Sequence, residues 1–178
     1  MSNYGEQIDE NTIQFKRILP GPIERIWSWI VEEDKRRQWL AAGEIELRQG
    51  GKVELLFNNR LLTTPDDKIP EKYKQYDGET RVVGEVLEID PPRLIKFTWP
   101  EDDGTSSIET IALDEKGDAV VLTLTHEKAE SFEAKVGVSA GWHAHLDIMA
   151  AKLAGDTPPK FWSHFSGLEA EYEGQLAR

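Results

Sequence analysis

Four consecutive strand-like segments constrain the fold of this chain more than any other feature. They cover residues 81–89, 93–99, 105–113 and 119–126, and short turns rich in Asp, Gly or Pro join them. Strands that are connected so tightly pair with their chain neighbours in antiparallel order. The sequence therefore predicts an antiparallel meander at the centre of the fold.

A long amphipathic helix is predicted after the meander, over residues 139–153. Its large apolar side chains recur at intervals of four, three and four, which is the spacing of one helix face. They are Trp142, Leu146, Met149 and Leu153. A helix with such a stripe can cover one face of the sheet.

The chain before the meander contains both strand and helix patterns. Residues 12–19 predict a first strand that ends at Pro20 and Gly21. Apolar residues at spacings of three and four predict a short helix over residues 23–30, and residues 32–40 predict a second helical turn. Two short helices are therefore expected after the first strand.

Two further strands are predicted at residues 44–48 and 52–58, as a hairpin around Gly50 and Gly51. Residues 59–80 form a long polar connection without a clear period. Such loops are often functional, so its segment 66–74 is either a gate over a cavity or an ordinary solvated loop.

A last helix is predicted after Pro158 and Pro159, because apolar residues again share one side. These residues are Phe161, Phe165, Leu168, Tyr172 and Leu176. We expect residues 156–178 to form a helical extension that packs on the main domain.

Three segments carry a family resemblance. They are residues 69–74 (IPEKYK), 91–99 (PPRLIKFTW) and 141–147 (GWHAHLD), and together they resemble the SRPBCC superfamily, in the branch homologous to activators of the heat-shock-protein-90 ATPase. The resemblance covers residues 10–155, which we expect to form one domain. It implies an α+β helix-grip fold, in which a curved antiparallel sheet of about seven strands wraps around a long C-terminal helix.

The resemblance also implies a deep, mostly apolar cavity between the sheet and the long helix. Strand parity and helix period direct a set of large side chains toward this interior. The set is Trp39, Phe57, Phe97, Trp99, Trp142, Leu146 and Met149. A packed core has the same sequence signature as a cavity wall, so simple core packing remains an alternative for each residue.

The chain has four histidines, all in its C-terminal third. His143 and His145 are two residues apart, so on a helix they diverge by roughly 200° and cannot grip one ion. We therefore predict no metal site and no cofactor, and no nucleophile motif indicates catalytic residues. His126 and His145 are candidates for polar groups inside the cavity.

Charge and composition exclude some partners and suggest a location. A net charge of -12 repels nucleic acid and anionic membrane surfaces. The chain has no cysteine, which fits a reducing compartment, and it shows neither a leader peptide nor an apolar run of roughly 20 residues. We expect a cytoplasmic protein that binds neither nucleic acid nor membrane.

Three functions remain open from the sequence. The first is the binding of a small, mostly apolar, lipid-like or aromatic ligand without evident catalysis. The second is an enzyme of cyclase, aromatase or hydrolase type, in which the same cavity orients a substrate and His126 or His145 moves a proton.

The third is a protein-interaction module, through the acidic surface or the last helix, in a monomer or a homodimer. Phe161, Trp162 and Phe165 could form its contact patch, although packing on the domain's own core is the alternative. Relatives that activate the chaperone carry an additional chaperone-binding domain, so chaperone binding is not expected here.

Overall fold

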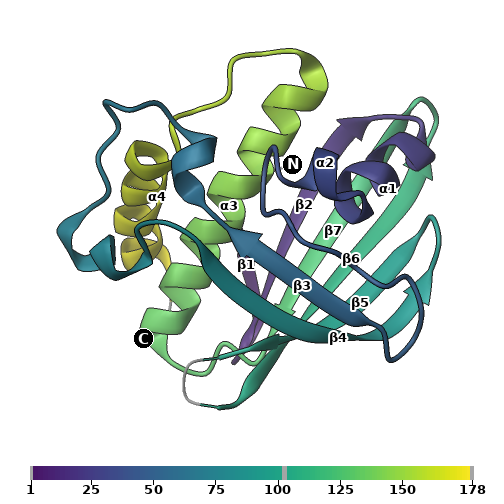
Figure 1. The fold of residues 1–178 in the computed structure, drawn as a ribbon, viewed down its shortest axis with the longest axis horizontal. Coiled ribbons are helices and arrows are strands. Elements are labelled where there is room, and N and C mark those ends of the chain that lie inside the picture. The colour runs from purple at the N-terminus through teal and green to yellow at the C-terminus, as the bar shows by residue number, and fades with distance from the viewer. Residues whose placement is uncertain (1, 102–103, 177–178) are drawn as a thin grey trace.

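The protein is described by a computed structural model that covers residues 2–101 and 104–176. All strands belong to one antiparallel, seven-stranded sheet with the order β1-β2-β7-β6-β5-β4-β3. Their bounds are β1 (Glu6–Asp9), β2 (Thr12–Pro20), β3 (Lys52–Phe57), β4 (Thr80–Asp90), β5 (Leu94–Pro100), β6 (Ser106–Lys116) and β7 (Ala119–Glu127). The sheet curves around a long helix, α3 (Phe132–Ala154), which lies along its inner face (Figure 1). The helix-grip fold predicted from the sequence is confirmed.

The strands of the meander place alternate side chains on the inner face. In β6, every second residue from Ser107 to Leu113 is buried, and in β5, Ile95 and Phe97 are buried while Lys96 between them is not. This alternation follows from the pleat of a strand, in which successive side chains point to opposite faces. It also brings one charged residue of β6, Glu109, into the interior.

The helix α3 begins seven residues earlier than the sequence predicts. Its N-cap is Ser131, whose Oγ accepts a hydrogen bond of 3.0 Å from the backbone N–H of Ala134, and it ends at Gly155 in the left-handed conformation. The first two turns contain Lys135 and Gly137 and lack a stripe of large apolar residues. Periodicity alone therefore could not reveal the true start.

The seven strands are not quite the seven that the sequence predicts. Residues 44–48 do not form a strand, because a tight turn joins the Arg48 N–H to the Glu46 carbonyl at 2.8 Å and leaves only an isolated bridge from Ile45 to Val53. The seventh strand is instead β1, which pairs with the outer edge of β2. The two short helices, α1 (Ile23–Val31) and α2 (Glu33–Arg36), consequently follow the second strand.

The connection from β3 to β4 packs against the C-terminal helix, α4 (Phe161–Gln175). It contains two short 3-10 helices, η1 (Asn59–Leu62) and η2 (Glu71–Tyr76). The Tyr73 ring lies against Phe165, with ring centroids 5.1 Å apart, and Asp67 accepts hydrogen bonds from the backbone N–H groups of Trp162 and Ser163 at 2.8 and 3.0 Å. The connection is thus tied to α4 rather than solvated along its whole length.

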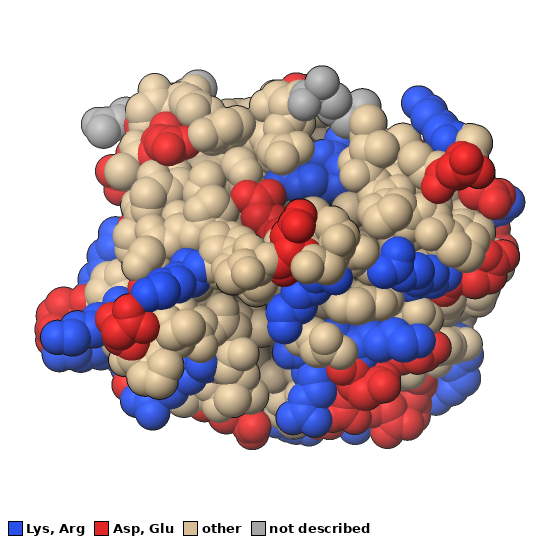
Figure 2. Space-filling model, turned by 90° about the horizontal axis from the view of Figure 1, so that it is seen from above, with Lys and Arg blue, Asp and Glu red and all other residues tan. Residues whose placement is uncertain are grey.

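The helix α4 lies beside α3 (Figure 1), and its apolar residues join the core that the sheet and α3 share. Phe161, Trp162 and Phe165 are all buried there. No helix within residues 2–101 and 104–176 is long and apolar enough to cross a membrane. Seen from above, acidic and basic side chains are interspersed on the visible face, so the net negative charge does not form a single continuous patch there (Figure 2).

Candidate functional site

A pocket of about 230 Å³ lies between the sheet and the face of α3 that carries Gly137, Gly141 and His145. Its walls come from the segment after α2, from β3, β5 and β7, and from α3. The lining residues are Leu40, Phe57, Trp99, Glu101, His126, Gly137, Val138, Gly141, Trp142 and His145. Glu101 is exposed, so the pocket opens to solvent on the side of the β5–β6 turn.

Two glycines of α3 leave room for this pocket. Gly137 and Gly141 are four residues apart, so they lie on the same face of the helix. A Cβ atom at either position would have no neighbour within 4 Å, apart from the adjacent residues of the chain and the backbone of the same helix. The helix therefore faces open space at the two positions where it lacks side chains.

Three aromatic rings form the apolar wall. The centroids of Trp99 and Trp142 are 5.8 Å apart in an edge-to-face arrangement, and Phe57 lies 5.5 Å from Trp99. Such contacts hold the rings in place while leaving ring surface available to a guest. The wall suits a flat, apolar molecule.

His126 and Glu109 form a buried acid–base pair at the pocket. They stand opposite each other in the β7–β6 register, and their side chains are 3% and 0% exposed. His126 Nδ1 is in direct contact with Glu109 Oε1. Beyond this contact, His126 Nε2 and both carboxyl oxygens of Glu109 have no hydrogen-bond partner among residues 2–101 and 104–176.

Burial and mutual attraction shift the pKa values of both groups. Burial raises the pKa of Glu109, because it penalises the carboxylate, and the charge of His126 offsets only part of this effect. Burial alone would lower the pKa of His126, but the adjacent Glu109 outweighs it and raises that pKa. The pair therefore tends to hold a proton that an isolated histidine and glutamate would release.

His145 is the second histidine at the pocket, and its environment is different. Its Nδ1 lies 2.7 Å from the backbone carbonyl oxygen of Trp39, so Nδ1 carries the hydrogen that this carbonyl accepts. Burial lowers its pKa to about 4, although the bond to Trp39 opposes this shift. His145 is thus neutral near pH 7.

The structure brings together five of the nine side chains that sequence reasoning proposed for the cavity. They are Phe57, Trp99, His126, Trp142 and His145. The other four, Trp39, Phe97, Leu146 and Met149, are buried in the core and do not line the pocket. Sequence reasoning missed Glu109 and the two glycines, although an acidic residue in phase with Ile111 and Leu113 on one strand was a usable signal.

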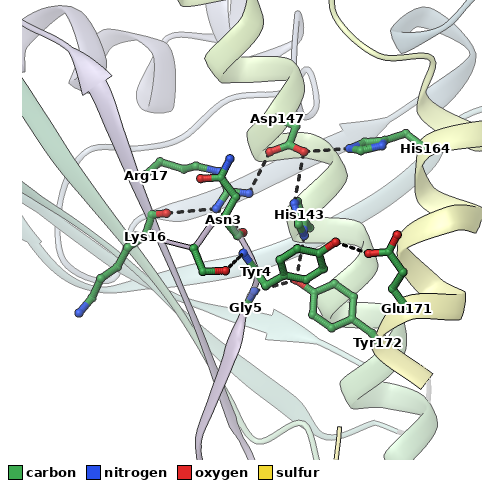
Figure 3. Close-up of polar contacts among 11 residues, drawn as sticks. Asn3, Tyr4, Gly5, Lys16, Arg17, His143, Asp147, His164, Glu171 and Tyr172 are labelled. Carbon is green, nitrogen blue, oxygen red and sulfur yellow. Dashed lines mark hydrogen bonds and ion pairs between the residues drawn. The ribbon is translucent and has the colours of Figure 1, made fainter. Parts of the chain in front are cut away.

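A second polar cluster, centred on Asp147, lies on another face of α3 (Figure 3). The Asp147 carboxylate accepts hydrogen bonds from Arg17 Nη2 at 3.0 Å and His164 Nε2 at 2.9 Å, and His143 Nε2 lies 3.3 Å from it. His143 Nδ1 is 2.9 Å from the Tyr172 hydroxyl. His143 and Asp147 are therefore part of a largely buried network.

The partners of Asp147 determine its ionisation. Burial would raise the pKa of Asp147, but hydrogen bonds from His143 and His164 and the charge of Arg17 hold it well below its usual range. In the part of the chain that the structure describes, no group of three or more candidate ligands is arranged to hold a metal ion. The Asp147 cluster is an internal connection between β2, α3 and α4.

Comparisons with solved structures identify similar folds. The protein encoded by gene BPP1335 of Bordetella parapertussis is 39% identical, with a TM-score of 0.83 over 99% of this chain and 92% of that one. CalU16 of Micromonospora echinospora is 21% identical, with a TM-score of 0.68 over 92% of this chain and 86% of that one. DynU16, from the dynemicin biosynthetic locus, is 15% identical, with a TM-score of 0.67 over 86% of this chain and 51% of that one.

The comparison with protein families agrees with the resemblance found in the sequence. No curated protein matches this chain. Residues 20–154 match the family described as "Activator of Hsp90 ATPase homolog 1-like protein". This match spans most of the chain and includes every strand of the meander and the whole of α3. The chain therefore belongs to the Activator of Hsp90 ATPase homolog 1-like family, within the SRPBCC superfamily.

Proposed function

We propose that this protein binds a small, mostly apolar molecule in the pocket between the sheet and α3, without evident catalysis. The observation that carries this proposal is the pocket wall, where Phe57, Trp99 and Trp142 face a space left open by Gly137 and Gly141. Concave apolar sites with a few polar groups are the usual form of small-molecule sites. We expect the ligand to contact all three rings.

The size of the pocket limits the ligand. An apolar cavity of about 150 Å³ in another protein holds one benzene ring. At about 230 Å³, this pocket has room for a molecule of one to two rings, and its open side allows a longer substituent to project into solvent. We therefore favour a compact aromatic ligand over a long-chain lipid.

Two other functions receive less support. The buried pair of His126 and Glu109 favours the enzyme hypothesis, because it could transfer a proton within the pocket. Self-association through α4 is disfavoured, because the aromatic residues that would form the contact are buried in the protein's own core. The similarity to DynU16 supports the fold alone, but the biosynthetic locus of that protein is compatible with small-molecule binding.

Naphthalene, which has two rings, is a suitable probe. We expect saturable binding that shifts the amide NMR signals of Gly137 and Gly141 more than those of α4. The variant Gly141→Leu should abolish these shifts, because its side chain would occupy the open space.

Gly167→Leu is the matched control, since Gly167 is an exposed glycine of α4 that also has open space around it. This variant should bind naphthalene as the wild type does. Equal binding by the wild type and the Gly141→Leu variant would place the ligand elsewhere and refute the proposal.

A further inference from the structure

We propose that the ligand of this pocket is a neutral aromatic carbonyl compound, whose oxygen accepts a hydrogen bond from Nε2–H of His126. This inference rests on the proposed function and specifies the ligand class. Its starting point is a polar atom without a partner. His126 lines the pocket and is 3% exposed, and its Nε2 has no hydrogen-bond partner in the described part of the chain.

A buried polar atom without a partner is uncommon in folded proteins and costs free energy. No other group of residues 2–101 and 104–176 satisfies this nitrogen, and His126 is one of the residues that line the pocket. A ligand oxygen that reaches the His126 ring could make the missing bond. The pocket thus offers a defined polar contact beside its aromatic wall.

The contact with Glu109 determines whether this nitrogen donates or accepts. Nδ1 of His126 is paired with Glu109 Oε1. The Trp142 Nε1–H also approaches Nδ1, but at 3.4 Å it is farther than in an ordinary hydrogen bond of about 2.9 Å. Glu109 is therefore the partner that fixes the orientation of the imidazole ring.

The proton shared by the pair makes Nε2 a donor in both of its arrangements. If the proton is on His126, the imidazolium carries hydrogen on both nitrogens. If it is on Glu109, the carboxylic acid donates to Nδ1, and the neutral ring carries its hydrogen on Nε2. The raised pKa values of both groups favour this protonated pair. A ligand oxygen that accepts a hydrogen bond complements either arrangement.

The charges around the pocket favour a neutral acceptor. The protonated pair carries no net charge in either arrangement, so it does not attract an anion over a distance. Glu101 lines the opening of the pocket and is acidic, and it would repel a carboxylate or phenolate. A carbonyl oxygen conjugated to a ring satisfies Nε2–H, contacts the aromatic wall and avoids this repulsion.

The test compares two probes that differ by one oxygen. 1-Tetralone is a bicyclic aromatic ketone, and tetralin has the same carbon skeleton without the carbonyl group. Titrations of the full chain, followed by the amide signals of Gly137 and Gly141, should show 1-tetralone binding about tenfold more tightly or better, since bonds to charged groups are among the stronger ones. Histidine-selective ¹⁵N labelling should show a shift of His126 Nε2 with 1-tetralone but not with tetralin.

The double variant E109L/H126L removes both members of the pair, so no buried charge is left without a partner. It should bind the two probes with affinities within about twofold of each other. If this variant does not fold, the wild-type affinities and the His126 signal still decide the question.

The outcomes separate the two proposals. Equal affinities for the two probes in the wild-type protein, with shifts at Gly137 and Gly141, would overturn the assignment of the carbonyl ligand and leave the apolar pocket in place. Absence of binding by 1-tetralone, tetralin and naphthalene alike would overturn the proposed function and this inference with it. A preference for 1-tetralone that persists in the double variant would overturn the role of His126.

Discussion

Two faces of α3 contact different polar clusters, and the difference separates structural histidines from a candidate site. One face contributes His143 and Asp147 to the cluster shown in Figure 3, in which partners from β2 and α4 complete the hydrogen bonds of the carboxylate. The face with Gly137, Gly141 and His145 lines the pocket beside the pair of His126 and Glu109, in which Nε2 and Oε2 have no partner within the described residues. Similar side chains are thus largely satisfied on one face and unsatisfied on the other.

The Asp147 cluster is consistent with a single neutral tautomer of His143. The Gly5 N–H donates to the Tyr172 hydroxyl oxygen at 2.7 Å, and this hydroxyl can donate to His143 Nδ1. The Nε2–H of the ring can then donate to Asp147. In this cluster, Arg17 Nε is the only buried side-chain atom without a hydrogen bond among residues 2–101 and 104–176. A network that leaves so little unpaired stabilises the fold and offers a ligand no free contact.

The two glycines on the pocket face explain why the pair of His126 and Glu109 remains beside open space. At the level of the Asp147 cluster, α3 is covered by α4, with side chains packed between them. At the level of His126, Gly137 and Gly141 contribute no side chain to the space in front of the sheet. The comparison predicts that changes at Asp147 affect stability most, and that changes at the glycines affect binding.

The largest expected effect is the loss of the Asp147 carboxylate. In Asp147→Ala, Arg17 would remain buried without its counter-charge, and breaking such a pair costs about 3–5 kcal/mol. Urea unfolding, followed by tryptophan fluorescence, measures this change.

Glu54→Gln is the control for the Asp147 variant, because it breaks a pair with the exposed Arg81. That change should cost less than about 1 kcal/mol. A cost for Asp147→Ala as small as that of the control would contradict the structural role of the cluster.

The second expected effect is a pH dependence caused by His145. Its pKa falls from 6.5 to about 4 on folding, so the unfolded chain binds the proton more tightly. The neutral ring makes its whole contribution to the free energy of unfolding above pH 6.5. This contribution, roughly 3 kcal/mol, is lost as the pH falls toward 4.

The variant His145→Asn can retain a donor to the Trp39 carbonyl but does not titrate. Its free energy of unfolding should therefore fall less steeply than that of the wild type between pH 6.5 and 4. The raised pKa of His126 contributes stability below pH 6.5 that is lost at higher pH. Because His126 is present in both proteins, this contribution cancels in the difference between their free energies of unfolding, which is the quantity to compare. Parallel pH profiles would disprove the assignment to His145.

The sequence predicted the fold better than the site, and particular residues explain the gap. Strand alternation identified the meander, and the stripe from Trp142 to Leu153 identified most of α3, because burial on one face imposes a regular period. The same period also placed Leu146 and Met149 at the cavity, but they fill the core. Periodicity reports which face is buried and does not report whether the buried face is fully packed.

Two parts of the site gave signals that pattern reasoning overlooks. The pocket depends on the absence of side chains at Gly137 and Gly141, and a glycine in a helix is usually considered only for its effect on helix stability. Glu109 occupies an inward position of β6, where an acidic residue is costly to bury. An unfavourable residue in a regular element was therefore more informative about the site than the favourable ones around it.

The smallest expected effect is that of Gly141→Ala. This variant separates the effect of the glycine on helix stability from its effect on the space in the pocket. A methyl group at this position would contact nothing within 4 Å, so the helix should gain about 1 kcal/mol from the better propensity of alanine. The melting temperature should rise by a few degrees while naphthalene binding weakens, since the methyl group takes up part of the pocket. Gly167→Ala should give a similar gain in stability with unchanged binding, because that glycine faces solvent on α4. If Gly141→Ala instead lowered the melting temperature, the space in front of the pocket face of α3 would be filled, and the contrast between its two faces would not hold.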